Sequence, residues 1–407
     1  MVGLRRMEGA SLLVCGVGMS VLSAALAMSA SVPADAQAST AKVEIEKSSQ
    51  LFGGRPAITI KRARTGDGTK PEILSVTVLP GRSMQILRVT ADVPGLGEQS
   101  LLEGPSIEAA AAIHALTDDK YGYKAFHMGA PFLIPFANRM VGDFPSTETP
   151  VTVRWDDKTL HLIPSNHTKG PDVHYVSIHG MFNYRAAAQV TEHTTKDGGT
   201  VEALFHCGDF EGHWPSKTDV TISVSLSGGG VMIDVHAKNV GDEKEPMSIG
   251  SHPFIRILGG DRTKIRIHVP AASHAEASTD GNTLPTGVVK PVEGTEWDFR
   301  AADGVAIGGR ALDDSFTDVH WDAAGAAATL MIDPVAHLGL RVASLSKDVS
   351  SIQVYAPTTR DVVAIEDQFN LNDPFGPEWK GRPTGMVVLK PGQSTEWKQS
   401  LQLFAVK

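Results

Sequence analysis

Four polar side chains stand where a strand pattern meets glycine or proline. They are Arg139 in "PFANRM", His179 in "SIHGMF", His252 in "GSHPF" and Glu366 in "VVAIEDQF". A histidine can hold or release a proton near neutral pH, and a carboxylate in a partly dry cleft can be tuned to the same range, so the set can do acid–base chemistry. Taken singly, each residue has a structural alternative, because such groups also serve as hydrogen-bonded or ion-paired residues.

The histidine at residue 252 has the most distinctive setting. The segment "MSIGSHPFIRI", residues 247–257, alternates apolar and polar residues and then meets a His-Pro pair. Proline has no backbone N–H and interrupts sheet pairing. The sequence therefore predicts that His252 lies at a strand end.

Other chemistries leave no matching pattern. The 15 histidines include no pair at the helical spacing of a zinc protease, and there is no C-x-x-C pair. Two segments, 167–174 and 206–213, each hold two histidines seven residues apart, a spacing that suits neither face of one strand. Neither a G-x-S-x-G elbow nor a Walker or dinucleotide glycine pattern occurs. We expect no metal and no organic cofactor.

Strand patterns dominate the elements that must position these residues. Segments 73–89, 151–163 and 220–240 each alternate, turn and alternate back, as hairpins do. Further strand patterns occupy 328–333, 338–345 and 351–357. The one good helical window is 106–121, which is rich in alanine. With 40 glycines and 24 prolines, the chain is predicted to be an all-β protein, a large antiparallel sandwich.

Composition and the first residues indicate which functions are excluded and where in the cell the protein is expected. The 407 residues carry a net charge of −9 without a basic run, which argues against nucleic-acid binding. Arg5 and Arg6 precede an apolar stretch and the sequence Ala34-Asp35-Ala36, so we expect residues 1–36 to be a signal peptide cleaved after Ala36. An uncleaved membrane anchor is the alternative, because the apolar run is long.

The mature chain is then an exported protein, periplasmic or secreted, with no stable membrane insertion. It keeps only Cys207 and forms no internal disulfide. Residues 37–72 are predicted to form an N-terminal strand extension, and residues 73–407 one sandwich domain.

Eight motifs occur in an order that resembles the aldose 1-epimerase, or galactose mutarotase, family, and together they span about residues 73 to 404. They are "GAPFLIPFANRM" (129–140), "SIHG" (177–180), "GSHPF" (250–254), "LPTGVVKPVEGTEWDFR" (284–300), "LDDSFTD" (312–318), "QVYAP" (353–357), "VVAIEDQFN" (362–370) and "VVLKPGQS" (387–394). The resemblance implies a galactose mutarotase-like supersandwich. It also implies an isomerase that interconverts the α and β anomers of free aldoses.

Carried over by motif, the resemblance makes His252 the general acid on the sugar's ring oxygen and Glu366 the general base on the anomeric hydroxyl. It implies that Arg139, His179 and Asp313 hold the sugar's hydroxyls, with Asp314 as a weaker match than Asp313. Gln353 is expected to line the pocket. Phe182, Phe254 and Trp214 are candidates for an aromatic face under the sugar, with core packing as the alternative for each.

The chain departs from the family pattern at two places. Phe254, Ile255 and Arg256 follow His-Pro where family members commonly have Tyr-Phe-Asn, which bears on sugar preference. Asp367 follows the proposed base where proline is common, and alternation along a strand predicts that its side chain points away from the site.

Three other functions stay open on sequence alone. One is a catalytically silent carbohydrate-binding sandwich, because a fold does not fix function. The others are a hexose-6-phosphate enzyme, which would want several arginines, and a glycoside hydrolase that uses Glu366 with Asp313.

Overall fold

The computed structural model describes residues 43–66, 68–115, 123–142, 151–168 and 175–407. The predicted signal peptide, residues 1–36, lies outside the described residues. The chain from Thr40 onward forms one compact unit. No helix in the described ranges has the length and apolar character needed to span a membrane.

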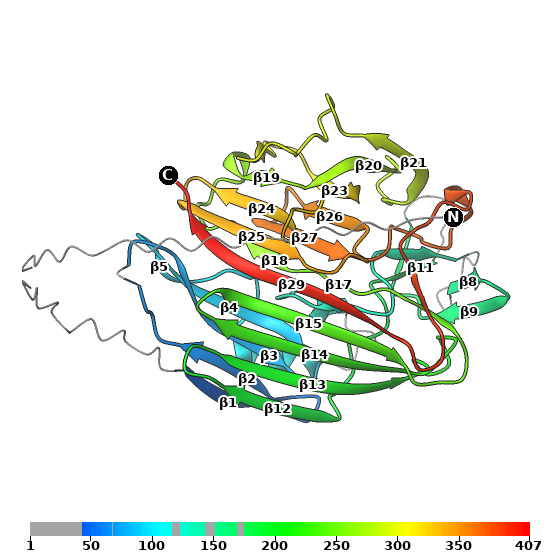
Figure 1. The fold of residues 1–407 in the computed structure, drawn as a ribbon, viewed down its shortest axis with the longest axis horizontal. Coiled ribbons are helices and arrows are strands. Elements are labelled where there is room, and N and C mark those ends of the chain that lie inside the picture. The colour runs from blue at the N-terminus through cyan, green and yellow to red at the C-terminus, as the bar shows by residue number, and fades with distance from the viewer. Residues whose placement is uncertain (1–42, 67, 116–122, 143–150, 169–174) are drawn as a thin grey trace, which may run out of the picture. The chain divides into compact units, whose positions relative to one another are not determined.

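Two large antiparallel sheets dominate the fold (Figure 1). The nine-stranded sheet contains, in spatial order, β12 (Gln189–Thr194), β13 (Gly199–Gly208), β14 (Thr218–Ser227), β15 (Gly230–Asn239), β29 (Ser394–Ala405), β25 (Leu338–Ser344), β24 (Ala327–Asp333), β19 (Arg266–His268) and β22 (Val305–Ala306). The eight-stranded sheet contains β21 (Pro285–Pro291), β20 (Ala271–Ala277), β23 (Leu312–Val319), β26 (Ser351–Ala356), β27 (Val362–Gln368), β17 (Gly250–Ser251) and β6 (Phe132–Leu133), with β18 (Phe254–Arg256) also paired to β27. The prediction of an all-β antiparallel sandwich is confirmed.

A third sheet comes from the start of the described chain. It runs in sequence order through β1 (Val43–Phe52), β2 (Arg55–Arg62), β3 (Glu72–Leu79), β4 (Gln85–Val93) and β5 (Gly97–Ser100). β2 pairs with β3, so hydrogen bonds cross the predicted boundary between residues 72 and 73. That boundary stays a prediction.

One hydrophobic core joins the three sheets. Ile60 and Val76 of the five-stranded sheet, Val235 and Trp397 of the nine-stranded sheet, and Ile365 of the eight-stranded sheet all belong to it. Trp397 is fully buried, and its Nε1–H donates to the backbone oxygen of Asp367 at 3.1 Å. The nine-stranded sheet is thereby fastened to β27, the strand that carries Glu366.

The three predicted hairpins are present. β3 pairs with β4, β14 pairs with β15, and β8 (Val151–Trp155) pairs with β9 (Lys158–Leu162). Along β14 every second residue is buried, from Thr218 to Leu226, because alternate side chains face the core. Strand alternation therefore located these elements to within a few residues.

The predicted helix is shorter than its sequence window. α1 (Ile107–His114) begins where the Ser106 hydroxyl accepts the Ala109 N–H at 3.2 Å, and Ala115 caps its end. The rest of the window, residues 116–121, lies outside the described residues. The remaining short elements are α2 (Tyr123–Phe126), β7 (Arg139–Val141), β10 (Asn166–His167), β11 (Tyr175–Ile178), β16 (Glu245–Met247), β28 (Val387–Leu389) and the 3-10 turns η1 (Arg262–Lys264) and η2 (Pro377–Trp379).

Candidate active site

The register of the eight-stranded sheet brings polar residues from three strands side by side. Ser315 on β23 lies opposite Gln353 on β26, and Gln353 lies opposite Glu366 on β27. Two residues further along the same pair of strands, Asp313 on β23 lies opposite Tyr355 on β26. Since residues two apart share a face of a sheet, these five side chains project from the same face. That face forms the floor of the site.

The His-Pro pair lies at the edge of this floor, beside β27 in the same sheet. β17 ends at Ser251 and β18 begins at Phe254, and both strands pair with β27, Gly250 with Gln368 and Phe254 with Ala364. The predicted interruption at proline is confirmed. The break places His252 opposite Glu366, and the His252 Nε2 atom lies 3.2 Å from the Glu366 Oε1 atom.

Arg139 and His179 come from a small sheet beside the floor. Arg139 begins β7 and pairs with Ile178 at the end of β11, so His179 follows directly. His179 and Gly180 both have left-handed backbones, with φ of 63° and 78°. A Cβ on Gly180 would lie 2.0 Å from the backbone oxygen of Ile134, so only glycine fits there. This turn aims the His179 imidazole back toward Arg139.

The backbone also fixes the tautomer of His179. The Asn138 backbone N–H donates to His179 Nδ1 at 3.2 Å, so Nδ1 is an acceptor and Nε2 carries the proton of the neutral ring. Burial is the main cause that lowers the pKa of His179 well below its usual value, and electrostatic interactions with His252 and Arg139 act in the same direction. His179 is therefore a neutral hydrogen-bond donor.

All six predicted site residues line one pocket, whose volume is about 200 Å³. They are Arg139, His179, His252, Asp313, Gln353 and Glu366. The pocket is thus a single chamber to which three separate sheet regions contribute.

Sequence reasoning missed several other lining residues. The missed polar and aromatic ones are Phe126, His127, Asn138, Ser165, Asn166, Asn183, Tyr184 and Tyr355. Asn138 and Tyr355 lie inside two of the quoted motifs, "FANRM" and "QVYAP", so the sequence could have predicted them. Phe126 comes from α2, outside any motif, yet its ring stacks on His179 with centroids 4.8 Å apart.

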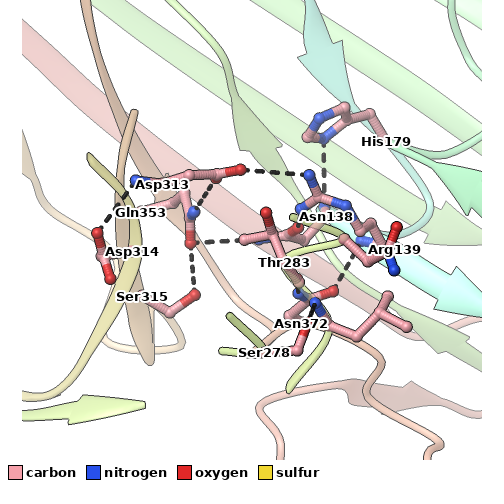
Figure 2. A network of polar contacts seen from close by, with 12 residues as sticks. Asn138, Arg139, His179, Ser278, Thr283, Asp313, Asp314, Ser315, Gln353 and Asn372 are labelled. Atoms are coloured by element: carbon pink, nitrogen blue, oxygen red, sulfur yellow. Dashed lines mark hydrogen bonds and ion pairs between the residues drawn. The ribbon is translucent and has the colours of Figure 1, made fainter. Parts of the chain in front are cut away.

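A continuous hydrogen-bond network holds the polar groups of the pocket (Figure 2). The Arg139 guanidinium donates to Asp313 Oδ2 at 3.3 Å and to Asn138 Oδ1 at 3.0 Å. Gln353 Nε2 donates to Asp313 Oδ1 at 2.7 Å, while Gln353 Oε1 accepts from Asn138 Nδ2 at 3.3 Å and from the Ser315 hydroxyl. Asn138, Arg139, Asp313 and Gln353 each make at least two of these contacts, so the cluster is preorganised for a polar ligand.

The pKa values of His252 and Glu366 are both strongly shifted by their surroundings. Burial is the main cause that lowers the pKa of His252 to about 3. Burial, with the negative charge of Asp313, raises the pKa of Glu366 well above its usual value, although Arg139 opposes the shift. Both effects favour the uncharged forms of the pair. A strongly perturbed acid and base in contact at the floor of a pocket is the usual mark of proton-transfer chemistry.

Each residue of the pair has one buried atom without a hydrogen-bond partner among the described residues, Nδ1 in His252 and Oε2 in Glu366. The side chain of Glu366 is almost completely buried, and its Oε2 finds no hydrogen-bond partner among the described residues. An unsatisfied buried carboxyl oxygen destabilises a fold, and it is expected where a ligand completes the hydrogen bonds.

Two acidic neighbours lie outside the pocket lining. Asp314 pairs with His274, with 2.9 Å between Oδ1 and Nε2, so Asp313 is the aspartate of the pair that lines the pocket. Asp367 points to the opposite face of β27, as strand alternation predicts, and its Oδ2 accepts from Gln399 Nε2 at 3.1 Å. Burial raises the pKa of Asp367 to about 7.

The aromatic candidates divide between pocket and core. Phe182 is fully buried against Phe205, and Trp214 stacks on Phe136, so neither lines the pocket and the core-packing alternative is confirmed for both. Both belong to the main hydrophobic core. Phe254 does line the pocket, with its ring 4.3 Å from that of His252.

Of the three residues after His-Pro that differ from the family pattern, one lies in the pocket. Ile255 is buried in the core, and Arg256 is exposed and donates to the Ser100 backbone oxygen at 3.3 Å. Only Phe254 of the three contacts the pocket.

One cluster of possible metal ligands occurs among the described residues. Asp234, His236 and Glu396 place ligand atoms within 4.8 Å of one another on the surface of β15 and β29. The Lys398 ammonium lies 2.6 Å from Glu396 and 3.2 Å from Asp234 and already supplies the positive charge. The cluster is best described as a surface ion-pair network.

The histidine pairs noted in the sequence give no second cluster of possible metal ligands among the described residues. His206 pairs with Asp219, and His174 lies outside the described residues.

Comparison with known proteins finds a family model that matches most of the chain and curated relatives that match part of it. The model of the aldose 1-epimerase family matches residues 112–402, well over half of the chain. Galactose mutarotases of mouse and rat are 31% identical over 93 residues and 30% identical over 146 residues. These matches cover 23% and 36% of this chain, and 27% and 40% of the mouse and rat proteins, so the chain spans less than half the length of these curated relatives.

Solved structures extend the likeness of fold. A galactose mutarotase-like protein from Clostridium acetobutylicum superposes with a TM-score of 0.67 at 17% identity, over 90% of this chain and 99% of that protein. A protein from Escherichia coli described as a putative aldose 1-epimerase gives a TM-score of 0.58 at 16% identity, over 82% and 97% of the two chains. At these identities the two structures support the fold alone.

Proposed function

The chain belongs to the aldose 1-epimerase family, and we propose that it is a mutarotase that interconverts the α and β anomers of free aldoses. The observation that carries the proposal is the contact between His252 and Glu366 on the pocket floor, where the buried Glu366 Oε2 atom has no hydrogen-bond partner among the described residues. An acid and a base that are buried and held in contact are what opening a sugar ring requires.

The reaction needs two proton transfers. The Glu366 carboxylate takes the proton of the hydroxyl on C1 while the His252 imidazolium gives one to the ring oxygen O5. The bond between C1 and O5 breaks, and C1 becomes an aldehyde. Rotation about the C1–C2 bond and the reverse transfers then close the ring to the other anomer.

A single proton on the pair is enough for this cycle. One group gains a proton while the other loses one, so the pair needs one proton in total. In the empty pocket, burial favours neutral His252 with protonated Glu366. Transfer across their 3.2 Å contact gives the imidazolium and carboxylate that react. The proposed chemistry proceeds with these side chains alone.

The remaining pocket residues are suited to hold the sugar. Arg139 and Asp313 offer a planar donor and a carboxylate that hydroxyl groups can bind, and neutral His179 offers its Nε2–H. Phe254 and Tyr355 give apolar surface for the C–H groups of the ring.

The pH dependence of kcat/KM tests the proton count. A second proton on the pair would create a buried positive charge, so the acid limb should follow the lowered pKa of His252, about 3. Lowering the pH from about 7 to about 5 should therefore not reduce kcat/KM, measured against the spontaneous rate at each pH. A loss of activity on acidification with a midpoint near 6.5, the ordinary value for histidine, would contradict this account.

Replacement of the guanidinium should affect binding more than chemistry. In an Arg139→Lys variant, a single ammonium cannot span Asn138 and Asp313 as the planar fork does. Loss of a charged hydrogen bond corresponds to a rise in KM of roughly 10- to 100-fold, with kcat changed much less. Arg256→Lys, at an exposed position outside the pocket, is the matched control. A fall in kcat at unchanged KM would remove Arg139 from sugar binding.

A carbohydrate-binding sandwich without catalysis is the alternative function. To separate the two, the equilibration of freshly dissolved α-glucose, α-galactose and several pentoses should be followed by polarimetry with the purified chain. Acceleration of at least one sugar supports the mutarotase. Binding without acceleration of any sugar would overturn it in favour of the binding function.

Two further alternatives fit the pocket less well. A hexose-6-phosphate substrate would require several cationic groups, and Arg139 is the one arginine among the described lining residues, which include no lysine. A glycoside hydrolase would need Asp313 as a free second carboxylate, but both of its oxygens accept hydrogen bonds, from Arg139 and Gln353.

We also propose that the protein is exported after cleavage behind Ala36, on the order of charge, apolar run and Ala-x-Ala in residues 1–36. Expression of the full chain in a bacterium followed by intact mass measurement should give a mature form that begins at Gln37. A protein that keeps its first residues and stays with the membrane fraction would support the anchor instead.

A further inference from the structure

A second and larger cavity adjoins the pocket. Its volume is about 940 Å³, and it shares Asp313 and Tyr355 with the pocket lining. The two residues lie opposite each other on β23 and β26. Asp313 and Tyr355 therefore border both the site of the reacting sugar and the second cavity.

Hydroxyl groups, carboxylates and aromatic rings line this second cavity. The polar residues are Glu276, Ser278, Thr279, Asp280, Thr283, Thr286, Asp314, Thr358 and Thr359. The aromatic ones are Tyr355 and Trp297. No lysine or arginine is among its described lining residues. Such a surface matches the hydroxyl groups and C–H faces of a neutral sugar better than a phosphate or another anion.

The aromatic wall is rigid. The Trp297 ring stacks on His274 with centroids 4.4 Å apart and an interplanar angle of 12°. His274 is buried and is held in turn by its 2.9 Å contact with Asp314. A ring fixed in this way loses little freedom when a ligand packs against it.

A hydrogen-bond chain ties the wall of the cavity to the reacting pocket. Asn372 Oδ1 accepts from the Arg139 backbone N–H at 3.2 Å, and Asn372 Nδ2 donates to the Thr283 backbone oxygen at 2.7 Å (Figure 2). The Ser278 hydroxyl accepts from the Leu284 N–H at 3.1 Å and closes the loop. The distance between the two chambers is thus set by the fold.

We propose that the second cavity is a subsite for the neighbouring sugar of a reducing oligosaccharide, whose reducing end occupies the pocket. The inference rests on the proposed function. With C1 and O5 facing Glu366 and His252, Asp313 receives a hydroxyl from C2, C3 or C4. A sugar joined through that oxygen extends past Asp313 into the second cavity. The glycosidic bond leaves C1 of the reducing sugar free to open, so the proton transfers are unchanged.

The test compares one monosaccharide with disaccharides. Exchange NMR gives kcat/KM for anomer interconversion of glucose, sophorose (1→2), laminaribiose (1→3) and cellobiose (1→4). We expect at least one disaccharide to match or exceed glucose. An Ala311→Trp variant adds bulk at an exposed residue that lines the second cavity only. It should lower kcat/KM for that disaccharide by about tenfold or more and leave glucose within about twofold.

Controls keep the outcomes separate. Ala323→Trp, at an exposed turn outside both cavities, should change neither substrate. If Ala311→Trp fails to fold, Thr358→Trp, also exposed and lining the cavity, replaces it. Acceleration of glucose but of no disaccharide would overturn the subsite and leave the mutarotase standing, as would an equal loss on both substrates in the blocked variant. Acceleration of no sugar at all would instead overturn the proposed function.

Discussion

A Glu366→Gln variant should lose mutarotase activity by roughly 10²- to 10⁴-fold in kcat, the contribution typical of one positioned proton transfer. Glutamine has the shape of the protonated carboxyl that burial favours here, but it cannot accept the proton of the C1 hydroxyl. Sugar affinity should change little, because the contacts of Arg139, Asp313 and Gln353 remain. Polarimetry gives the rate, and titration calorimetry gives the affinity.

The adjacent residue provides the matched control. Asp367 is the next carboxylate on β27, is equally buried and points into the core. Asp367→Asn keeps an oxygen for the Gln399 hydrogen bond and should leave kcat within about threefold. A Glu366→Gln protein that melts like the parent and keeps its rate would remove Glu366 from the mechanism.

A His252→Asn variant should lose activity by a similar factor, about 10²- to 10⁴-fold in kcat. Asparagine can form a hydrogen bond to O5 but cannot deliver a proton to it. The Glu366 carboxyl then also loses its contact with the imidazole. The variant should still bind sugar, as calorimetry would show.

The second histidine of the pocket is the control for this change. The rings of His179 and His252 lie 5.4 Å apart. His179→Asn removes a neutral donor to a sugar hydroxyl, so it should raise KM more than it lowers kcat. If His179→Asn abolished kcat and His252→Asn raised only KM, the two roles would be exchanged.

Local sequence patterns predicted much of the fold, because they report local physics. Alternation in 220–240 marks strands with one face in the core, and β14 and β15 follow it. The proline after His252 interrupts pairing wherever it stands in a strand, so the break between β17 and β18 was also predictable.

Contacts between distant segments were harder to predict. That Asp313, Gln353 and Glu366, on three neighbouring strands, share one face of the sheet depends on register, which no single segment encodes. The family resemblance supplied this grouping, and the pocket contains the whole set. Phe126 reaches His179 from α2, a segment with no strand or motif signal.

The side-chain directions of the aromatic residues were also not predictable from the sequence. Phe182 follows the His179 turn closely in sequence, yet the left-handed backbone at His179 and Gly180 precedes it and it packs into the core. Neither its residue type nor its distance from the motif reveals that turn. Side-chain direction after an irregular turn has to be observed.

The most direct test of the central claim is two-dimensional exchange NMR on an already equilibrated aldose with a catalytic amount of protein. We expect cross-peaks between the α and β C1 protons with the parent chain and with Asp367→Asn, at mixing times too short for spontaneous exchange. Glu366→Gln should give none. Equal cross-peaks with Glu366→Gln, or none with a parent chain that binds the sugar, would contradict ring opening by the His252 and Glu366 pair.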